Sequence, residues 1–201
     1  LNFEESPENL PWLTRKYYQY YFPLFAKRSD RLQTVSEFSK KDIVQRYGID
    51  PDLIDVVYNG AHERFQPMTE NEITAYRNNS TEGAPYFVFV GALNPRKNVA
   101  RLLHAFDALK KSSDLPHKLL IVGEKMFLTG SIQEAFQSME HSKSVIFTGR
   151  LDNEPLRRVV AAAESLILPS TYEGFGIPLV EAMQCGVPVL AADATALPEV
   201  T

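Results

Sequence analysis

The residues Leu166-Ile-Leu-Pro-Ser-Thr-Tyr-Glu-Gly-Phe-Gly-Ile-Pro-Leu-Val-Glu181 join an apolar run, a segment with two glycines and the start of an amphipathic stretch. This order predicts a strand, a loop and a helix. The start of a helix exposes unpaired backbone N–H groups and a partial positive charge, so it suits a phosphate. Glu173 and Glu181 flank that point, and carboxylates accept hydrogen bonds from sugar hydroxyls. The stretch therefore favours a ligand that carries both groups, such as a nucleotide sugar.

Four further apolar runs repeat the pattern of this first strand. All five are short, bounded by glycine or proline and rich in Val, Ile, Leu or Phe, as strands buried on both faces are. Helical patterns separate them, which predicts a doubly wound α/β domain with a parallel, Rossmann-like sheet. Ligands bind such sheets beyond the carboxyl ends of the strands, so the loops there are expected to face the site. The runs are residues 86–91, 118–123, 144–149, 165–169 and 187–191.

Capping residues locate the helices between these strands. We expect Asn98 to cap a helix that carries Leu102, Leu103, Phe106 and Leu109 at helical spacing. The tetrapeptide at residues 131–134 has the form of a capping box. Asp152 is expected to cap a third helix, with Pro155 tolerated in its first turn.

The first 65 residues differ from this regular pattern. Residues 11–28 form an aromatic and basic stretch that we expect to be helical but broken near Pro23. Two strands, at 31–35 and 54–58, and a helix that Ser36 caps follow it. We interpret residues 1–65 as the tail of a larger upstream domain that this chain mostly lacks, the polar residues 66–85 as a linker, and residues 86–201 as the α/β domain, truncated at its carboxyl end.

The composition narrows the class of protein. Of the 201 residues, 44% are hydrophobic and 23% charged, as in a globular domain, and the net charge of −4 argues against a general nucleic-acid binder. Apolar runs are too short for a membrane span. The single cysteine, Cys185, excludes an internal disulfide within the chain and fits a reducing, cytoplasmic compartment.

Five segments in order resemble glycosyltransferase family 4, also called group 1, whose members are retaining enzymes of the GT-B fold. The resemblance covers the chain from about Thr34 to its end, mainly the C-terminal donor-binding domain of that fold. Two glutamates with seven residues between them would be a weak signal alone, but the ordered set is specific. The segments are Thr34–Ser39, Val57–Gly60, Gly91–Asn98, Phe147–Leu151 and Pro169–Val189.

The resemblance implies a role for each residue around the two glutamates. Glu173 corresponds to the glutamate that accepts hydrogen bonds from the donor sugar, and Glu181 to the one that binds the ribose hydroxyls. The backbone of Gly174, Phe175, Gly176 and Ile177 would approach the sugar and diphosphate, which explains the absence of bulky residues at 174 and 176. The structural alternative is that both glutamates are ordinary solvated charges.

Basic residues in two other loops complete the expected donor site. Lys97 is positioned to neutralise the leaving diphosphate, and Arg96 beside it to add a forked contact. Many family members have arginine directly after the strand glycine, where this chain has Ala92, so either Arg96 takes that part or the leaving group is held less tightly. The loop at Arg150 and Leu151 resembles the one that contacts the nucleotide base. For Arg96 and Arg150 a plain surface position remains the alternative.

Together these features predict a hexosyltransferase whose donor is GDP- or UDP-linked and whose acceptor is a glycan or a lipid-linked glycan in polysaccharide biosynthesis. The run at residues 94–98 resembles that of family members that use GDP-mannose, and this resemblance favours mannose as the donor sugar. Neither a metal nor another cofactor is expected, because no acidic cluster or histidine spacing suits one and the family transfers sugars without metal. The first alternative is a non-catalytic nucleotide-sugar-binding module. The second is a glycosidase, which requires two carboxyls facing one bond.

Two expectations concern the chain beyond its donor site. The aromatic and basic residues 11–28 suit either packing against an upstream domain or peripheral contact with the inner face of a membrane. With the acceptor-side domain largely missing, the chain alone is expected to bind donor but to be inactive or weakly active.

Overall fold

The computed structural model describes residue 4, residues 11–124 and residues 130–201. Their contacts form two compact units. The first unit contains the described part of Leu1–Gly60 together with Thr171–Gly176 and Asp193–Thr201, and the second contains Ala61–Ser170 and Ile177–Ala192. Two short segments from late in the sequence therefore group with its first sixty residues.

The second unit is built on a parallel sheet of five strands in the order β5-β4-β3-β6-β7. The five apolar runs of the sequence form these strands, which confirms the predicted Rossmann-like α/β fold. The side chains of the central strands β3 and β4 are largely buried between helices, whereas Leu190 on the edge strand β7 is 61% exposed. The bounds are β3 Tyr86–Val90, β4 Lys118–Val122, β5 Val145–Gly149, β6 Ser165–Leu168 and β7 Val189–Ala191.

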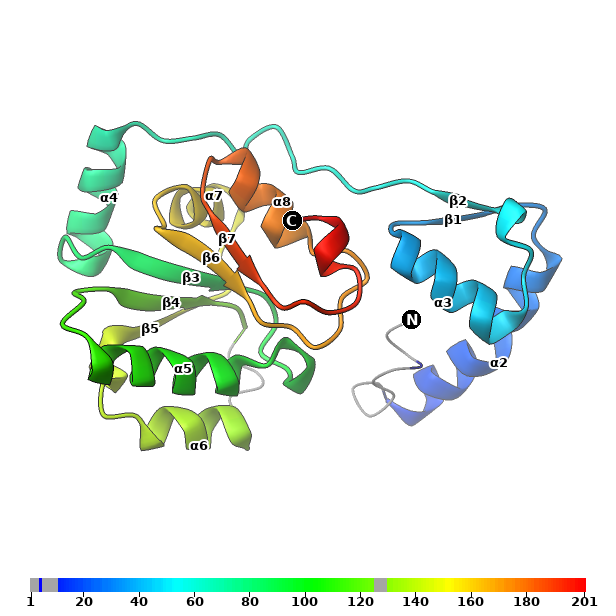
Figure 1. Cartoon of the computed structure of the whole chain (residues 1–201), viewed down its shortest axis with the longest axis horizontal. Coiled ribbons are helices and arrows are strands. Elements are labelled where there is room, and N and C mark those ends of the chain that lie inside the picture. The colour runs from blue at the N-terminus through cyan, green and yellow to red at the C-terminus, as the bar shows by residue number, and fades with distance from the viewer. Residues whose placement is uncertain (1–3, 5–10, 125–129) are drawn as a thin grey trace. The chain divides into compact units, whose positions relative to one another are not determined.

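Helices cross between the strands on both faces of this sheet. Figure 1 shows α5 and α6 on one face and α7 and α8 on the other. The chain moves outward from β3 to β4 and β5, then returns to place β6 on the other side of β3. The point of reversal, between β3 and β6, is where doubly wound sheets open a crevice for ligands. The helices are α5 Val99–Ser112, α6 Ser131–Ser138, α7 Asn153–Ala161 and α8 Ile177–Gln184.

Residues 66–85, interpreted as a linker, contain helix α4 (Glu70–Thr81) and group with the sheet in the second unit. A capping box starts this helix: the Thr69 side chain accepts a hydrogen bond from the Glu72 amide, and the Glu72 carboxylate accepts one from the Thr69 amide. Arg77 then ties α4 to the sheet domain by donating to the Ala162 carbonyl over 2.9 Å. A polar composition here reflects an exposed helix rather than a flexible segment.

The first unit contains a parallel pair of strands, β1 (Leu32–Thr34) and β2 (Ile54–Val56), with helices α2 (Trp12–Arg28) and α3 (Glu37–Tyr47). Ser36 caps α3, as predicted, by accepting a hydrogen bond from the Ser39 amide. A short 3-10 turn, η2 (Pro51–Leu53), leads into β2. The small core consists of Ala26, Ile43, Tyr47, Ile49 and Ile54, with Phe22, Leu32 and Val44 packed against it.

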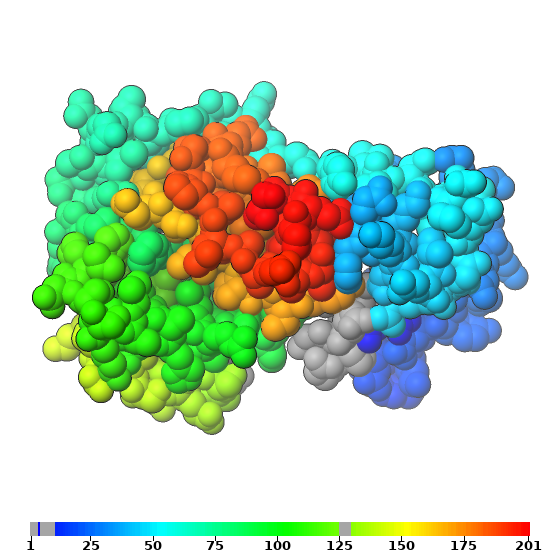
Figure 2. All heavy atoms as spheres, viewed as in Figure 1, coloured from blue at the N-terminus to red at the C-terminus, as the bar shows by residue number. Residues whose placement is uncertain are grey.

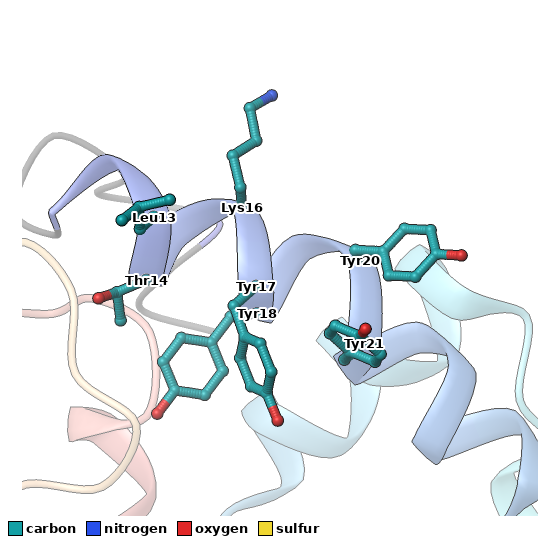
Figure 3. A pocket seen from close by; sticks show the side chains of 7 residues that line it. All are labelled: Leu13, Thr14, Lys16, Tyr17, Tyr18, Tyr20 and Tyr21. Atoms are coloured by element: carbon teal, nitrogen blue, oxygen red, sulfur yellow. The ribbon is translucent and has the colours of Figure 1, made fainter.

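Helix α2 is continuous, so the expected break at Pro23 is absent. Phe22 and Ala26 flank the proline and pack on the unit's core, which holds the helix together despite the lost backbone hydrogen bond. The opposite side is an exposed aromatic surface around a hollow of about 630 Å³ (Figure 3). The Tyr17 and Tyr21 rings lie 4.7 Å apart there. The hollow is lined by Leu13, Thr14, Lys16, Tyr17, Tyr18, Tyr20 and Tyr21.

Candidate functional site

A cavity of about 260 Å³ lies at the carboxyl ends of β3, β4 and β5. Arg150 and Leu151, the two residues expected at the nucleotide base, both line it. Arg150 is exposed, so its guanidinium is available to a ligand, whereas Leu151 is partly buried. The remaining lining residues come from the ends of β3 and β4 and from α7: Val90, Gly91, Ala92, Val122, Gly123, Glu124 and Leu156.

Two glycines let the loops after β3 and β4 approach each other at this cavity. A Cβ atom on Gly123 would lie 2.0 Å from the Gly91 carbonyl oxygen, a distance that no side chain tolerates. Gly91 itself has φ +154°, and its amide donates to the Val122 carbonyl over 2.9 Å. The Gly123 amide donates in turn to Gly149 over 3.0 Å. Because glycine has no Cβ, the backbones at the ends of β3 and β4 can come close together at the cavity.

Lys97 lies at the end of β3, in the loop where the sequence placed it. A 3-10 turn, η3 (Pro95–Lys97), shapes this loop, and the Asn94 side chain accepts a hydrogen bond from the Lys97 amide over 3.2 Å. The Lys97 side chain is only 8% exposed. A Cβ on Gly91 would contact its Cε at 3.3 Å and its Nζ at 3.5 Å, so the ammonium lies directly over the strand end. Arg96 beside it is partly buried.

Asn98 links the loop after β3 to the end of β6, at the point where the strand order reverses. It occupies the N-cap position of α5 but makes no side-chain cap, which corrects the expected role. Its backbone is left-handed, with φ 57°, and its amide nitrogen Nδ2 donates to the Pro169 carbonyl at the end of β6 over 3.2 Å. Asn98 thus fixes the Lys97 loop to the segment that leads toward Glu173.

The other capping predictions had mixed outcomes. The helix expected from the capping box at residues 131–134 begins at Ser131, but its N-cap is Gly130 and no side chain caps it. Asp152 does occupy the N-cap of α7, with Pro155 in the first turn, although its side chain makes no cap hydrogen bond. Lys125, which follows the cavity residue Glu124 in the sequence, lies outside the described residues.

Glu181 lies on α8 in the second unit, and its carboxyl is partly buried. Removal from water raises the pKa of Glu181 to about 7, because burial penalises the charged form. One turn later the buried Cys185 thiol has its pKa raised to about 11, chiefly by burial, so it is an inert core group. Strongly shifted pKa values of this kind are common among groups that bind ligands.

Glu173 belongs to the first unit, where it is buried with 7% exposure. Its backbone amide donates to the Thr195 hydroxyl Oγ1 over 2.9 Å. Phe175 is also buried, and its ring lies 5.9 Å from that of Tyr58. The expected site residues are thus divided by their contacts. The first unit holds Glu173, Gly174, Phe175 and Gly176, and the second holds Arg96, Lys97, Arg150, Leu151, Ile177 and Glu181.

Within residues 11–124 and 130–201 and at residue 4, no three His, Cys, Asp or Glu side chains gather where they could hold an ion. None of the helices in this same part of the chain has the length and apolar character needed to cross a bilayer.

Comparison with known proteins adds a second line of evidence. Residues 71–201 match the family model described as glycosyl transferases group 1, and residues 3–64 match the model described as glycosyltransferase family 4. The O-antigen chain mannosyltransferase B of Escherichia coli is 29% identical over 168 residues, which are 83% of this chain and 44% of that protein. The O-antigen chain mannosyltransferase RfbU of Salmonella typhimurium is 30% identical over 190 residues, 94% of this chain and 49% of the relative.

The chain therefore spans about half the length of the curated relatives that it matches. Among solved structures, the Anabaena protein HepE in complex with UDP and glucose is similar with a TM-score of 0.79. It is 24% identical, and the match covers 96% of this chain and 52% of HepE. At that identity the similarity supports the fold, and it extends over both units of the chain.

Proposed function

Because the chain belongs to the group 1 glycosyltransferases, we propose that it supplies the donor site of a hexosyltransferase. The whole protein would move a hexose from a nucleoside-diphosphate sugar to an acceptor hydroxyl with retention of configuration. The observation that carries this proposal is the buried cation Lys97 over the end of β3, at the reversal point of the sheet and next to a cavity. A fixed positive charge there suits a diphosphate.

In the proposed mechanism the protein mainly stabilises the departing group. The bond between the sugar's anomeric carbon and the diphosphate breaks, and Lys97 and Arg96 balance the charge that builds on the phosphate. The amides at the start of α8 add to this stabilisation. The acceptor oxygen attacks from the same face and passes its proton to the leaving phosphate, so the scheme requires no protein base. We also propose that the transfer needs no metal ion, and a chelator should leave the rate unchanged.

Two carboxylates are proposed to hold the rest of the donor. Glu173 would accept hydrogen bonds from the hydroxyls of the sugar, and Glu181 from the hydroxyls of the ribose. The cavity beside Arg150 and Leu151 would receive the base, with the guanidinium over or beside the ring. The backbone at Gly174, Phe175, Gly176 and Ile177 would contact the sugar and diphosphate.

We propose mannose as the donor sugar. Two relatives with about 30% identity are named O-antigen chain mannosyltransferases. HepE was crystallised with UDP and glucose. A test should therefore include UDP-glucose as well as GDP-mannose, the donor that the proposal favours. A glycan acceptor assembled on the cytoplasmic side of a membrane is the corresponding setting.

The surface of α2 supports a related proposal on location. This helix has four basic side chains and no acidic one, and its exposed aromatic surface includes Trp12 and several tyrosines. Such a composition suits the head groups of an anionic bilayer. The expected outcome is flotation of the chain with vesicles that contain phosphatidylglycerol but not with neutral ones. Equal flotation of the chain with anionic and with neutral vesicles would refute this membrane contact.

A panel of ligands tests the proposed function. Thermal unfolding of the chain should shift upward with UDP or GDP, and further with the matching nucleotide sugar, because a ligand that binds only the folded state stabilises it. No shift with any nucleotide, together with hydrolysis of a simple glycoside, would favour the glycosidase alternative. Binding without transfer by a longer parent that includes the acceptor-side domain would favour a binding module.

A further inference from the structure

Glu199 makes two hydrogen bonds to a helix that begins 162 residues earlier in the chain. Its carboxylate oxygen Oε2 accepts from the Glu37 amide over 2.8 Å, and Oε1 accepts from the Phe38 amide over 2.6 Å. Both partners belong to the first turn of α3. Figure 2 shows the carboxyl-terminal residues in red against the light-blue surface of this helix. A residue from the end of the sequence thus caps a helix near its beginning.

This contact completes the first turn of α3. An α-helix leaves its first backbone N–H groups without partners inside the helix. Ser36 accepts from the Ser39 amide with its side chain and from the Lys40 amide with its carbonyl. Glu199 accepts the remaining two, and its negative charge lies at the positive end of the helix dipole. The cap is therefore shared between a local serine and a distant glutamate.

The segment that carries Glu199 also makes a hydrogen bond to the backbone of Glu173. Thr195, four residues earlier, has φ 55°, a left-handed conformation that a β-branched residue adopts only at a cost. In this conformation its hydroxyl accepts the hydrogen bond from the Glu173 amide over 2.9 Å. Ala196 and Leu197, between the two contacts, are fully buried. Residues 195–199 therefore form a short, anchored bridge from the Glu173 loop to α3.

Two further contacts join the loop to α3 directly. The rings of Phe38 and Tyr172 meet edge to face with centroids 5.7 Å apart. The Ser39 hydroxyl lies 3.5 Å from the Gly174 carbonyl, at the limit of a hydrogen bond. Residues on both sides of Glu173 thus contact the turn that Glu199 caps, and all of these groups belong to the first compact unit.

We propose that Glu199 is a positioning residue for the donor sugar. By fixing the first turn of α3 and the bridge 195–199, it sets the place of the loop that carries Glu173. Glu199 itself touches no reacting group in this scheme. The inference rests on the proposed function only for the identity of the ligand, because the link between Glu199 and Glu173 is a property of the unliganded chain.

Hydrogen exchange tests this link without any ligand. The amides of Glu37 and Phe38 should exchange about threefold to thirtyfold faster in Glu199→Ala, the usual effect of losing a helix cap. The Glu173 amide should also exchange faster, although it bonds to Thr195 and not to Glu199. Glu72→Ala is the matched control, since it removes a carboxylate cap from α4 and should leave the Glu173 amide unchanged. Faster exchange at residues 37 and 38 alone would overturn the proposal.

Further variants guard against simple unfolding. Glu199→Gln keeps the size of the side chain and one carbonyl acceptor, so it should give intermediate rates in a folded chain. Thr195→Val should speed exchange at Glu173 as Glu199→Ala does, whereas Thr195→Ser keeps the hydroxyl and should restore the slow rate. An unchanged Glu173 rate in Glu199→Gln and in Thr195→Val would also contradict the bridge.

Binding measurements test the consequence for the sugar. In Glu199→Ala the affinity for the free nucleoside diphosphate should stay within twofold, while the extra affinity contributed by the sugar should fall about threefold to tenfold. Equal losses for both ligands, or no loss for either, would refute the positioning role. If the unaltered chain binds neither ligand, the proposed function fails, and the exchange data alone decide whether Glu199 holds the Glu173 loop.

Discussion

Replacing Glu181 with glutamine should make the unliganded chain more stable while weakening its binding of nucleotide. Burial raises the pKa of the Glu181 carboxyl to about 7 from an ordinary value of 4.5. The folded state therefore favours the protonated form. Folding stability from this group is complete below pH 4.5 and is lost as the pH rises toward 7, because the partly buried carboxyl must then ionise.

The magnitude follows from the size of this shift. A change of about 2.5 pKa units corresponds to roughly 3 kcal/mol at 1.36 kcal/mol per unit. Because the side chain is only partly buried, solvent screening reduces this figure, and we expect about 1–2 kcal/mol. Glutamine carries no charge at any pH, so Glu181→Gln should gain this free energy of unfolding at pH 8 but only about a quarter of it at pH 5.

Urea denaturation at the two pH values measures the difference. Glu82→Gln is the control, because the hydrogen bond from Lys118 lowers the pKa of the Glu82 carboxyl and the substitution should not stabilise the chain at pH 8. The nucleotide affinity of Glu181→Gln should fall at pH 8 if the carboxylate binds ribose. Equal stability of Glu181→Gln and the unaltered chain at pH 8 would refute the reasoning about burial.

Two other substitutions test the packing behind the site. Gly123→Ala should destabilise the chain by about 2 kcal/mol or more and abolish nucleotide binding, because its Cβ would overlap the Gly91 carbonyl oxygen. A variant that binds nucleotide normally would show that the loops after β3 and β4 do not meet. Burial alone would raise the pKa of the Asp107 carboxyl, but hydrogen bonds from the His141 amide and from Lys111 lower it to about 2. Asp107→Asn should therefore cost about 1–3 kcal/mol at pH 7 in urea denaturation, and the loss should disappear as the pH falls from 4 to 2.

The sheet was predictable because its signal is local. Each of the five strands is a short apolar run between glycines or prolines, and parallel strands place their carboxyl ends at one edge. That edge holds Lys97, Arg150 and Leu151, as the sequence indicated. The helix at Glu70–Thr81 also has a local signal, since Thr69 and Glu72 have the spacing of a capping box.

Other features depend on contacts that no local pattern records. Helix α2 continues through Pro23 because the packing of Phe22 and Ala26 outweighs a lost hydrogen bond. Asn98 bonds to the end of β6 rather than to its own helix. The bridge from Thr195 to Glu199 involves partners 22 and more than 160 residues away, so only the folded chain reveals it. Tertiary contacts decided these cases against local preference.

Calorimetric titration of the chain with GDP-mannose and UDP-glucose tests the proposed donor site most directly. We predict binding of one nucleotide sugar at a single site, with an affinity that Lys97→Gln lowers at least tenfold because the cation over β3 is lost. The unfolding midpoint of the variant should stay close to that of the unaltered chain, which separates lost binding from lost folding. Absence of binding heat with both sugars, or the same affinity in Lys97→Gln, would contradict a donor site at the end of β3.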